Sequence, residues 1–178
     1  MKTEQNCGRF PMLTVAAVAA GLATSAGAQE TQFDSADTAG GSGAQIVDAT
    51  MLDEIMASFG RNGLSVELTE DSQGDPRIRS TDRSQPFSLY FYGCTDNEDC
   101  GYVQFSAGWD LENGITLAKV EEWNANRLWG TAYRDDEKDP WLTLTVNLKY
   151  GITVENLDDT IDWWKITMPR FAEHIGFE

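Results

Sequence analysis

The stretch that decides the fold is residues 153–175, which read TVENLDDTIDWWKITMPRFAEHI. Large apolar residues recur in it at alternating spacings of three and four: Val154, Leu157, Ile161, Trp164, Met168, Phe171 and Ile175. This spacing places all of them on one stripe of an α-helix, where burial stabilises the fold by about 1.5–3 kcal/mol for each residue. We therefore predict a long helix that lies across a sheet.

Both ends of this helix carry recognisable signals. Thr153 can cap the first turn, and Gly176 can end the last one. Pro169 lacks an N–H donor, so we expect it to kink the helix or divide it near Thr167. The same spacing also suits a coiled-coil seam, but three heptads interrupted by a proline make a weak coiled coil.

The first 28 residues resemble a secretory signal peptide. Lys2 and Arg9 precede an apolar run over residues 12–23, and Ala26-Gly27-Ala28 follows it. A basic start, a short apolar run and small residues at the cleavage site are the marks of such a peptide. We expect cleavage after Ala28 and a periplasmic location. The alternative, a retained membrane anchor, requires a longer apolar run than this one.

The chain that remains after cleavage is strongly acidic. Removal of residues 1–28 changes the formal net charge from −16 to −17. A protein of this charge is repelled by nucleic acid and by anionic lipid, so we expect neither as a partner and no membrane insertion after cleavage. Residues 29–45 are mostly Gly, Ser, Ala, Thr and acidic residues, and they predict a disordered linker.

Two cysteines remain in the mature chain, Cys94 and Cys100. An even number of cysteines in an exported chain favours a disulfide. The carboxylates between them, Asp96, Glu98 and Asp99, lack the ligand spacing of a calcium-binding EF-hand loop, so a solvated acidic turn is the simpler interpretation.

Residues 46–178 are expected to form one α+β domain. A first helix carries apolar residues between Met51 and Phe59 and is capped by Asp48 or Thr50. Strands are predicted over residues 64–70, 77–81, 87–93 and 102–109, with the polar strand 77–81 at an edge. A helix over 114–128 with Leu117, Val120 and Trp123 inward follows, and then strands over 129–133 and 141–148. Connections of hairpin length predict an antiparallel sheet of about five to six strands, with the helices on one face.

One tract resembles a known family. Residues 120–133, VEEWNANRLWGTAY, are similar to the signature of the bacterial YbjN family, in which a helix ends in an Asn-containing tract followed by Arg and then a strand. The resemblance continues through residues 51–177. It implies a fold similar to that of type III secretion chaperones and a role in sensory-transduction regulation. The cysteine pair fits exported members, and the family supplies no catalytic residues.

The residue types that carry common chemistries are sparse. His174 is the only histidine, no Gly-x-Ser-x-Gly elbow or phosphate-binding loop occurs, and two cysteines with one histidine do not make a zinc site. We therefore predict no catalytic residues, no metal and no cofactor. The alternative is an acid-pair hydrolase acting on a polysaccharide or similar envelope substrate, in which Asp110 and Glu112 beside Trp109 would supply the carboxylates.

The most unusual polar tract offers a candidate binding surface, which consists of Trp123, Asn124, Asn126, Arg127 and Trp129. Arg and Trp are enriched among the residues that dominate binding energies, so this tract could recognise a partner. Alternatively, the amides and the guanidinium satisfy the end of the helix and the turn that follows it.

The sequence as a whole favours an exported, non-enzymatic binding, regulatory or chaperone-like module that recognises a protein or peptide. This hypothesis predicts an exposed apolar surface between the sheet and the helices, or a homodimer formed through it.

Overall fold

The structure is a computed structural model, and it describes residues 43–177. The predicted signal peptide and most of the predicted linker lie outside this range. The described chain begins with a short strand, β1 (Ile46–Val47), that pairs antiparallel with β8 (Ile152–Thr153). The carbonyl of Gln45 also accepts from the Val154 N–H at 2.9 Å. The start of the domain is therefore attached to the start of the last helix.

The main sheet has six antiparallel strands in the order β2-β3-β4-β5-β7-β6. Their bounds are β2 (Val66–Glu70), β3 (Pro76–Asp82), β4 (Gln85–Tyr92), β5 (Tyr102–Gly108), β6 (Thr131–Arg134) and β7 (Pro140–Asn147). The predicted α+β class and antiparallel sheet are confirmed. The edge position predicted for residues 77–81 is wrong, because β3 lies between β2 and β4. Its polar residues, Arg77 and Arg79, lie on the sheet face away from buried Ile78, and do not mark an edge.

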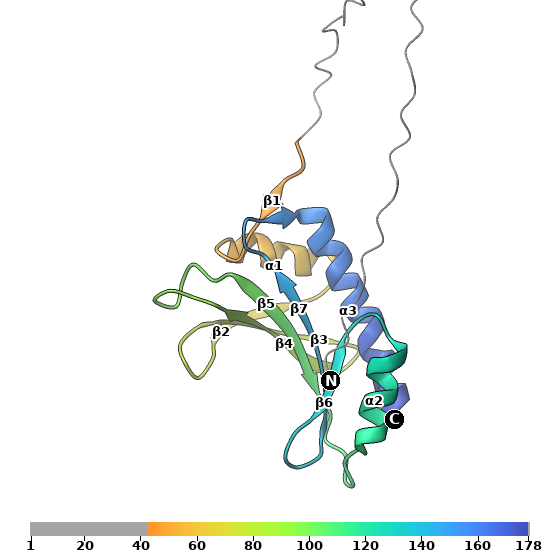
Figure 1. Cartoon of the computed structure of the whole chain (residues 1–178). Helices are drawn as coiled ribbons and strands as arrows, with labels where there is room; N and C mark the ends of the chain where they lie inside the picture. Colours follow the sequence, from red (N-terminus) through yellow and green to blue (C-terminus); the bar gives the residue numbers. More distant parts are fainter. Residues whose placement is uncertain (1–42, 178) are drawn as a thin grey trace, which may run out of the picture. The chain divides into compact units, whose positions relative to one another are not determined.

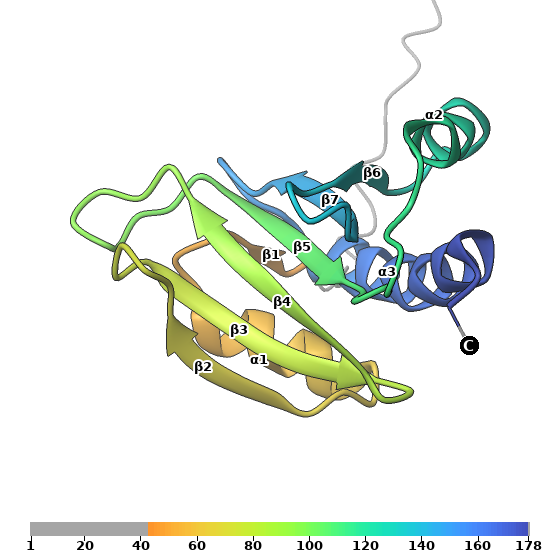
Figure 2. The ribbon, with the colours of Figure 1, turned by 90° about the horizontal axis from the view of Figure 1, so that it is seen from below.

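Three helices accompany the sheet: α1 (Leu52–Arg61), α2 (Leu117–Asn126) and α3 (Val154–Ile175). Figure 1 shows their order along the chain, and Figure 2 shows α1 behind β2 and β3, with α2 beside β6. The predicted cap of α1 is wrong. Met51 is the N-cap residue and makes no side-chain capping bond, while the Asp48 carboxylate accepts from the N–H and hydroxyl of Thr50. Leu117 is 56% exposed, contrary to prediction, since it is the first residue of α2.

Helix α3 buries the whole predicted stripe from Val154 to Ile175. The Thr153 hydroxyl accepts from the Asn156 N–H, and Gly176 ends the helix in the left-handed conformation with φ 75°. The predicted division near Thr167 is wrong, because the helix is continuous through Pro169. An interior proline costs about 3 kcal/mol. Burial of Met168 and Phe171, one on each side of it, offsets that cost.

The core lies between the sheet and helices α1 and α3. At its centre Phe59, Phe87, Phe105 and Trp164 pack with ring centroids 5.4–6.5 Å apart. The Arg61 guanidinium joins the two helices by donating to the Asp158 carboxylate at 2.8 Å. Within the described chain the helices thus cover one face of strands β2–β5, and Figure 2 looks onto the other face.

Candidate functional site

The uncovered face of the sheet contains a groove of about 840 Å³. Side chains alternate between the two faces of a strand, so residues paired across strands share a face. Arg79, Ser88 and Ser106 form one such row, with Arg77 and Tyr90 in the row beside it. We call this site the sheet groove and define it by Arg77, Arg79, Ser88, Tyr90, Ser106 and Trp141. Its floor is made of small hydroxyl side chains, and its borders carry aromatic and basic ones.

Arg77 is held in place by contacts within the sheet groove. Its Nε and Nη2 donate to the Ser88 hydroxyl oxygen at 3.0 and 2.8 Å. Its guanidinium also lies 4.8 Å from the centroid of the Tyr90 ring. A cation over an aromatic face is attracted by the ring's quadrupole. Because these contacts already fix the guanidinium, the Arg77 side chain loses less conformational freedom when a ligand binds to it.

Trp141 is held at the other border of the groove. A Cβ added to Gly108, its cross-strand partner, would lie 2.8 Å from the indole, so only glycine lets the ring lie so close to the backbone. The ring stacks on Tyr133 with centroids 6.2 Å apart. Its N–H donates to Asp135 Oδ2 at 2.9 Å, and this bond is the main reason that the pKa of Asp135 falls below its ordinary value. The indole face is thus presented in one orientation.

Three tyrosines extend the aromatic surface along the same face of the sheet. Tyr90, Tyr92 and Tyr102 pack in sequence, with centroids 6.4 and then 5.7 Å apart. Burial, with a smaller contribution from neighbouring groups, raises the pKa of Tyr92, so its hydroxyl stays neutral well into the alkaline range. An aromatic strip therefore leads from the sheet groove toward the loop that joins β4 to β5.

The charges around the groove are mixed. Glu67, Asp110 and Asp139 line it together with the two arginines. Arg79 lies 4.0 Å from Glu67, and Asp139 accepts from the Leu111 N–H at 3.1 Å. Of the two carboxylates in the acid-pair alternative, Asp110 lines the groove, whereas exposed Glu112 does not. The structure therefore does not bring the two together in one groove.

Two residues of the predicted binding tract are engaged inside the fold. Trp123 is 1% exposed, packs edge-on against Phe171 and donates to the Gly130 carbonyl at 3.1 Å. The Asn124 amide bonds the N–H and the carbonyl of Ala132 in β6. These contacts dock α2 onto the sheet, so Trp123 is not available to a partner in this structure.

Of the rest of the tract, Asn126 and Arg127 are exposed and Trp129 is half-buried. Asn126 donates to the Glu122 carbonyl at the end of α2, and Arg127 lies 5.5 Å from the Trp123 ring. Trp129 stacks on Trp163 of α3 with centroids 5.5 Å apart. The tract and the sheet groove have no residue in common. That Asn126, Arg127 and Trp129 recognise a partner stays a prediction.

Comparison with known proteins decides the family. The model of the YbjN family, described as "Putative bacterial sensory transduction regulator", matches residues 51–177. This chain belongs to the YbjN family. A crystal structure of YbjN, "a putative transcription regulator from E. coli", is similar at 18% sequence identity with a TM-score of 0.43. The match covers 70% of this chain and 84% of that one. No curated protein matches.

In this YbjN family member, the sequence did not point to Arg77, Tyr90 and Trp141 as site residues. All three lie in predicted strands, where the strand pattern accounts for them without a role in binding. A signal was present, because these residues alternate with buried Ile78, Leu89 and Leu142. Combined with the expectation that helices cover one face, that alternation places the three on the open face.

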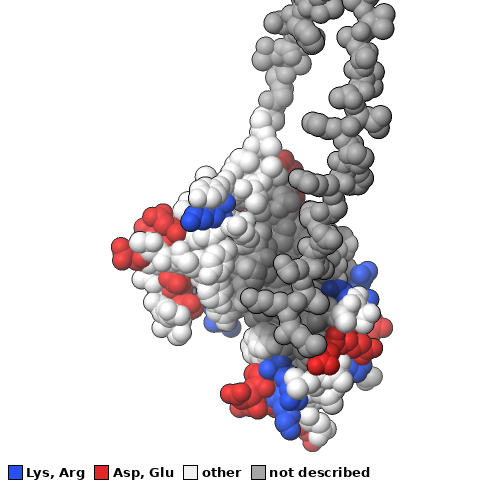
Figure 3. All heavy atoms as spheres, in the orientation of Figure 1, with Lys and Arg blue, Asp and Glu red and all other residues white. Residues whose placement is uncertain are grey.

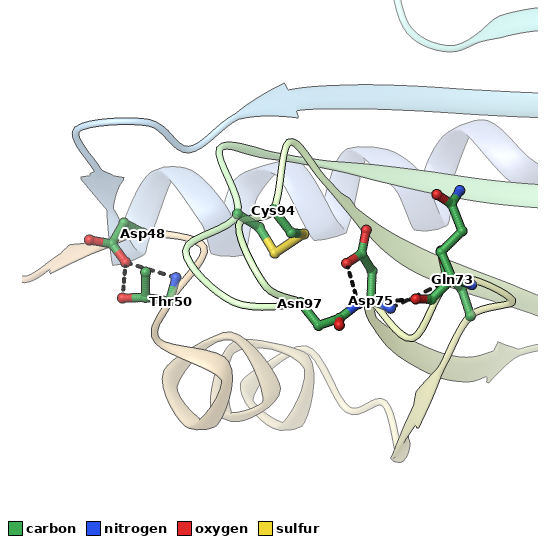
Figure 4. Close-up of a disulfide and its surroundings, with 8 residues drawn as sticks. Asp48, Thr50, Gln73, Asp75, Cys94 and Asn97 are labelled. Atoms are coloured by element: carbon green, nitrogen blue, oxygen red, sulfur yellow. Dashed lines mark hydrogen bonds between the residues drawn. A yellow bond between two sulfur atoms is a disulfide. The ribbon is translucent and has the colours of Figure 1, made fainter.

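The loops that connect strands at one end of the sheet are acidic and tied together. Cys94 and Cys100 form a disulfide across the base of the β4–β5 loop. Figure 4 shows that Asn97, at the tip, donates to the Gln73 carbonyl and to Asp75 Oδ1 at 3.1 and 3.0 Å. Acidic side chains gather over these loops, at the left in Figure 3. The disulfide and Asn97 together fix the end of the aromatic strip.

In residues 43–177, no group of three or more His, Cys, Asp or Glu side chains is placed to bind a metal ion. In the same part of the chain, no helix combines the length and the apolarity that crossing a membrane requires.

Proposed function

We propose that this YbjN family member is an exported regulatory module that acts by binding a protein or peptide partner, and not by catalysis. The observation that carries the proposal is the pre-organised sheet groove on the uncovered face, bordered by Arg77, Tyr90 and Trp141. Family membership agrees with a regulatory role. Export is supported by the signal-like residues 1–28 and by the Cys94–Cys100 disulfide.

The composition of the groove suits an extended peptide segment. Arg, Tyr and Trp are the residue types that most often dominate protein interfaces. Here they border a floor of Ser88 and Ser106, whose small side chains leave room for a peptide backbone. The rim carries both acidic and basic side chains, which favours a partner with charged groups of both signs over a polyanion or a polycation.

A second copy of the chain is one partner to consider. Light scattering of the mature protein at several protein and salt concentrations distinguishes a stable dimer from a monomer. A dimer that persists after the groove is altered uses another surface, whereas a dimer lost with the groove identifies the second copy as the partner.

The test of the proposal is capture from an envelope extract with matched variants. The variant Arg77→Ala/Tyr90→Ala removes a cation–aromatic pair inside the groove. The control variant Lys149→Ala/Tyr150→Ala removes another such pair, in which Lys149 Nζ lies 5.7 Å from the Tyr150 ring. Tyr150 is 93% exposed, and neither residue lines the groove.

We expect the wild type and the control to retain the same protein and the groove variant to lose it by about tenfold or more. Circular dichroism of all three proteins verifies that they are folded. Equal capture by the two folded variants would contradict binding in the sheet groove.

A further inference from the structure

A second cavity, of about 640 Å³, lies between the β3–β4 turn and the last turns of α3. Most of its wall is apolar, from Pro86, Trp109, Met168, Pro169, Ala172 and Phe177. Its volume is in the range that holds a small ligand, and an apolar wall with a few polar groups is typical of such sites. The polar groups therefore decide which ligand it suits.

The first polar group is the indole N–H of Trp109. Trp109 is 3% exposed and packs against Phe171 with ring centroids 5.1 Å apart. Its Nε1 is buried and makes no hydrogen bond within the described chain. A buried donor without a partner is unfavourable, and Trp N–H groups that are buried usually have one. Trp109 lines the cavity, so a ligand that displaces part of the wall can supply the missing acceptor.

The second polar group is the carboxylate of Asp82. Strand β3 places Asp82 on the same face as buried Ile78 and Ser80, which is the face toward the helices. Oδ2 of Asp82 is buried and has no hydrogen-bond partner within residues 43–177. A buried carboxylate oxygen calls for a donor, and a cationic donor compensates it best. Two residues in the wall of one cavity thus carry a buried unpartnered donor and a buried unpartnered anionic acceptor.

The surrounding charges favour a cation as well. Asp110 is a second carboxylate on the wall, and Arg83 is the one basic side chain there. Arg83 is exposed, and it lies in the two-residue turn at the end of β3. The whole chain has a formal net charge of −16, which attracts cations to any of its cavities.

We propose that this cavity is a binding site for a small amphiphilic cation. The ammonium group of the ligand donates to Asp82, an oxygen or other acceptor on the ligand faces the Trp109 N–H, and the apolar body packs on Met168, Pro169 and Phe177. Pro86, Gly108, Trp109 and Asp110 line both cavities. Arg77 and Tyr90 of the sheet groove do not line this one, so the site does not depend on the proposed function.

The probe is 3-(octyloxy)propylamine, which combines an ammonium group, an ether oxygen and an alkyl chain. Two controls of nearly equal shape replace the ammonium with a hydroxyl, 3-(octyloxy)propanol, or with a carboxylate, 3-(octyloxy)propanoate. Binding is followed below micellar concentrations by the ¹H–¹⁵N resonance of the Trp109 indole in the full mature chain. That resonance is assigned by its loss in Trp109→Phe.

We expect a saturable shift of the Trp109 resonance with the amine, with an affinity about tenfold or more above that of the alcohol, and no saturable shift with the carboxylate. Asp82→Asn should abolish the preference for the amine over the alcohol. Asp53 is an exposed residue of α1 outside the cavity. Asp53→Asn makes the same charge change there, and this variant should bind the amine as the wild type does.

Three results would overturn the proposal: no saturable shift with the amine, equal or tighter binding of the carboxylate, or an amine preference that survives in folded Asp82→Asn. Folding of each variant is judged from the dispersion of its amide resonances. Arg77→Ala/Tyr90→Ala serves as a further control, since it should leave amine binding unchanged whether or not the sheet groove binds a partner.

Discussion

The side-chain amide of Asn124 pairs with both backbone groups of Ala132. Its Oδ1 accepts from the Ala132 N–H at 2.8 Å, and its Nδ2 donates to the Ala132 carbonyl at 3.0 Å. Ala132 belongs to β6, an edge strand of the sheet. An exposed edge presents unpaired N–H and carbonyl groups that can recruit other chains. Asn124 therefore joins α2 to β6 and also covers part of the edge.

Replacement of Asn124 should destabilise the fold. Asn124→Ala removes two hydrogen bonds, and we expect the free energy of unfolding to fall by about 1–2 kcal/mol, with more aggregation at high concentration. Asn126→Ala is the matched control, since it makes the same change in the same turn of α2 and loses one bond, to Glu122. Urea unfolding measures both. Equal losses for the two variants would refute the role given to Asn124.

The hydrogen bond from Trp141 to Asp135 predicts a pH effect. The pKa of Asp135 is lowered in the folded state from its ordinary 3.8, so the stabilisation is present above that pH and is lost as pH falls through the lower folded value. Trp141→Phe removes the main cause, and we expect the pKa of Asp135 to rise toward 3.8. NMR titration of the carboxyl carbon measures it. An unchanged pKa in Trp141→Phe would show that the backbone N–H donors dominate instead.

The β3–β4 turn offers a stabilising change. Arg83 and Ser84 both have positive φ, at 47° and 69°, in a two-residue hairpin loop. This geometry suits Asn-Gly, and a side chain in the left-handed region costs about 1 kcal/mol or more per residue. We expect Arg83→Asn/Ser84→Gly to raise the free energy of unfolding by about 1 kcal/mol in urea unfolding. A decrease would mean that contacts of the Arg83 side chain outweigh the backbone strain.

The disulfide should be detectable by mass spectrometry, and its removal should lower the free energy of unfolding. Mass spectrometry of the purified protein under non-reducing conditions should find Cys94 bonded to Cys100. Cys94→Ser/Cys100→Ser should lower the free energy of unfolding by about 2–3 kcal/mol, from the loop-closure entropy of a short loop. Free thiols at both positions would contradict the disulfide and weaken the case for export to an oxidising compartment.

The sequence predicted those parts of the fold that depend on periodicity. The stripe from Val154 to Ile175 and the alternation in residues 102–109 are regular, and both elements were found in place. Local signals were less reliable. Asp48 and Thr50 are good N-cap residues, but Asp48 instead closes a turn on Thr50, just before the N-cap residue Met51. Capping preferences do not distinguish these two uses of the same side chain.

The site was harder to predict than the fold, because it depends on relations between distant strands. Tyr90 and Arg77 are 13 positions apart in the chain and become a pair only through the β3–β4 register. The tract around Asn124 stood out in sequence because its residue types are unusual together. In the structure Trp123 and Asn124 make contacts within the fold. An unusual residue composition therefore marked a packing motif, whereas ordinary strand residues form the groove.

The most direct test of binding in the sheet groove is photo-crosslinking in cells that express the full chain. p-Benzoylphenylalanine replaces Tyr90 in one variant and Tyr150, which is 93% exposed and outside the groove, in the other. We predict one discrete crosslinked adduct, containing a partner or a second copy, with the probe at position 90 and none at position 150. No adduct at position 90, or the same adduct at both positions, would contradict the account.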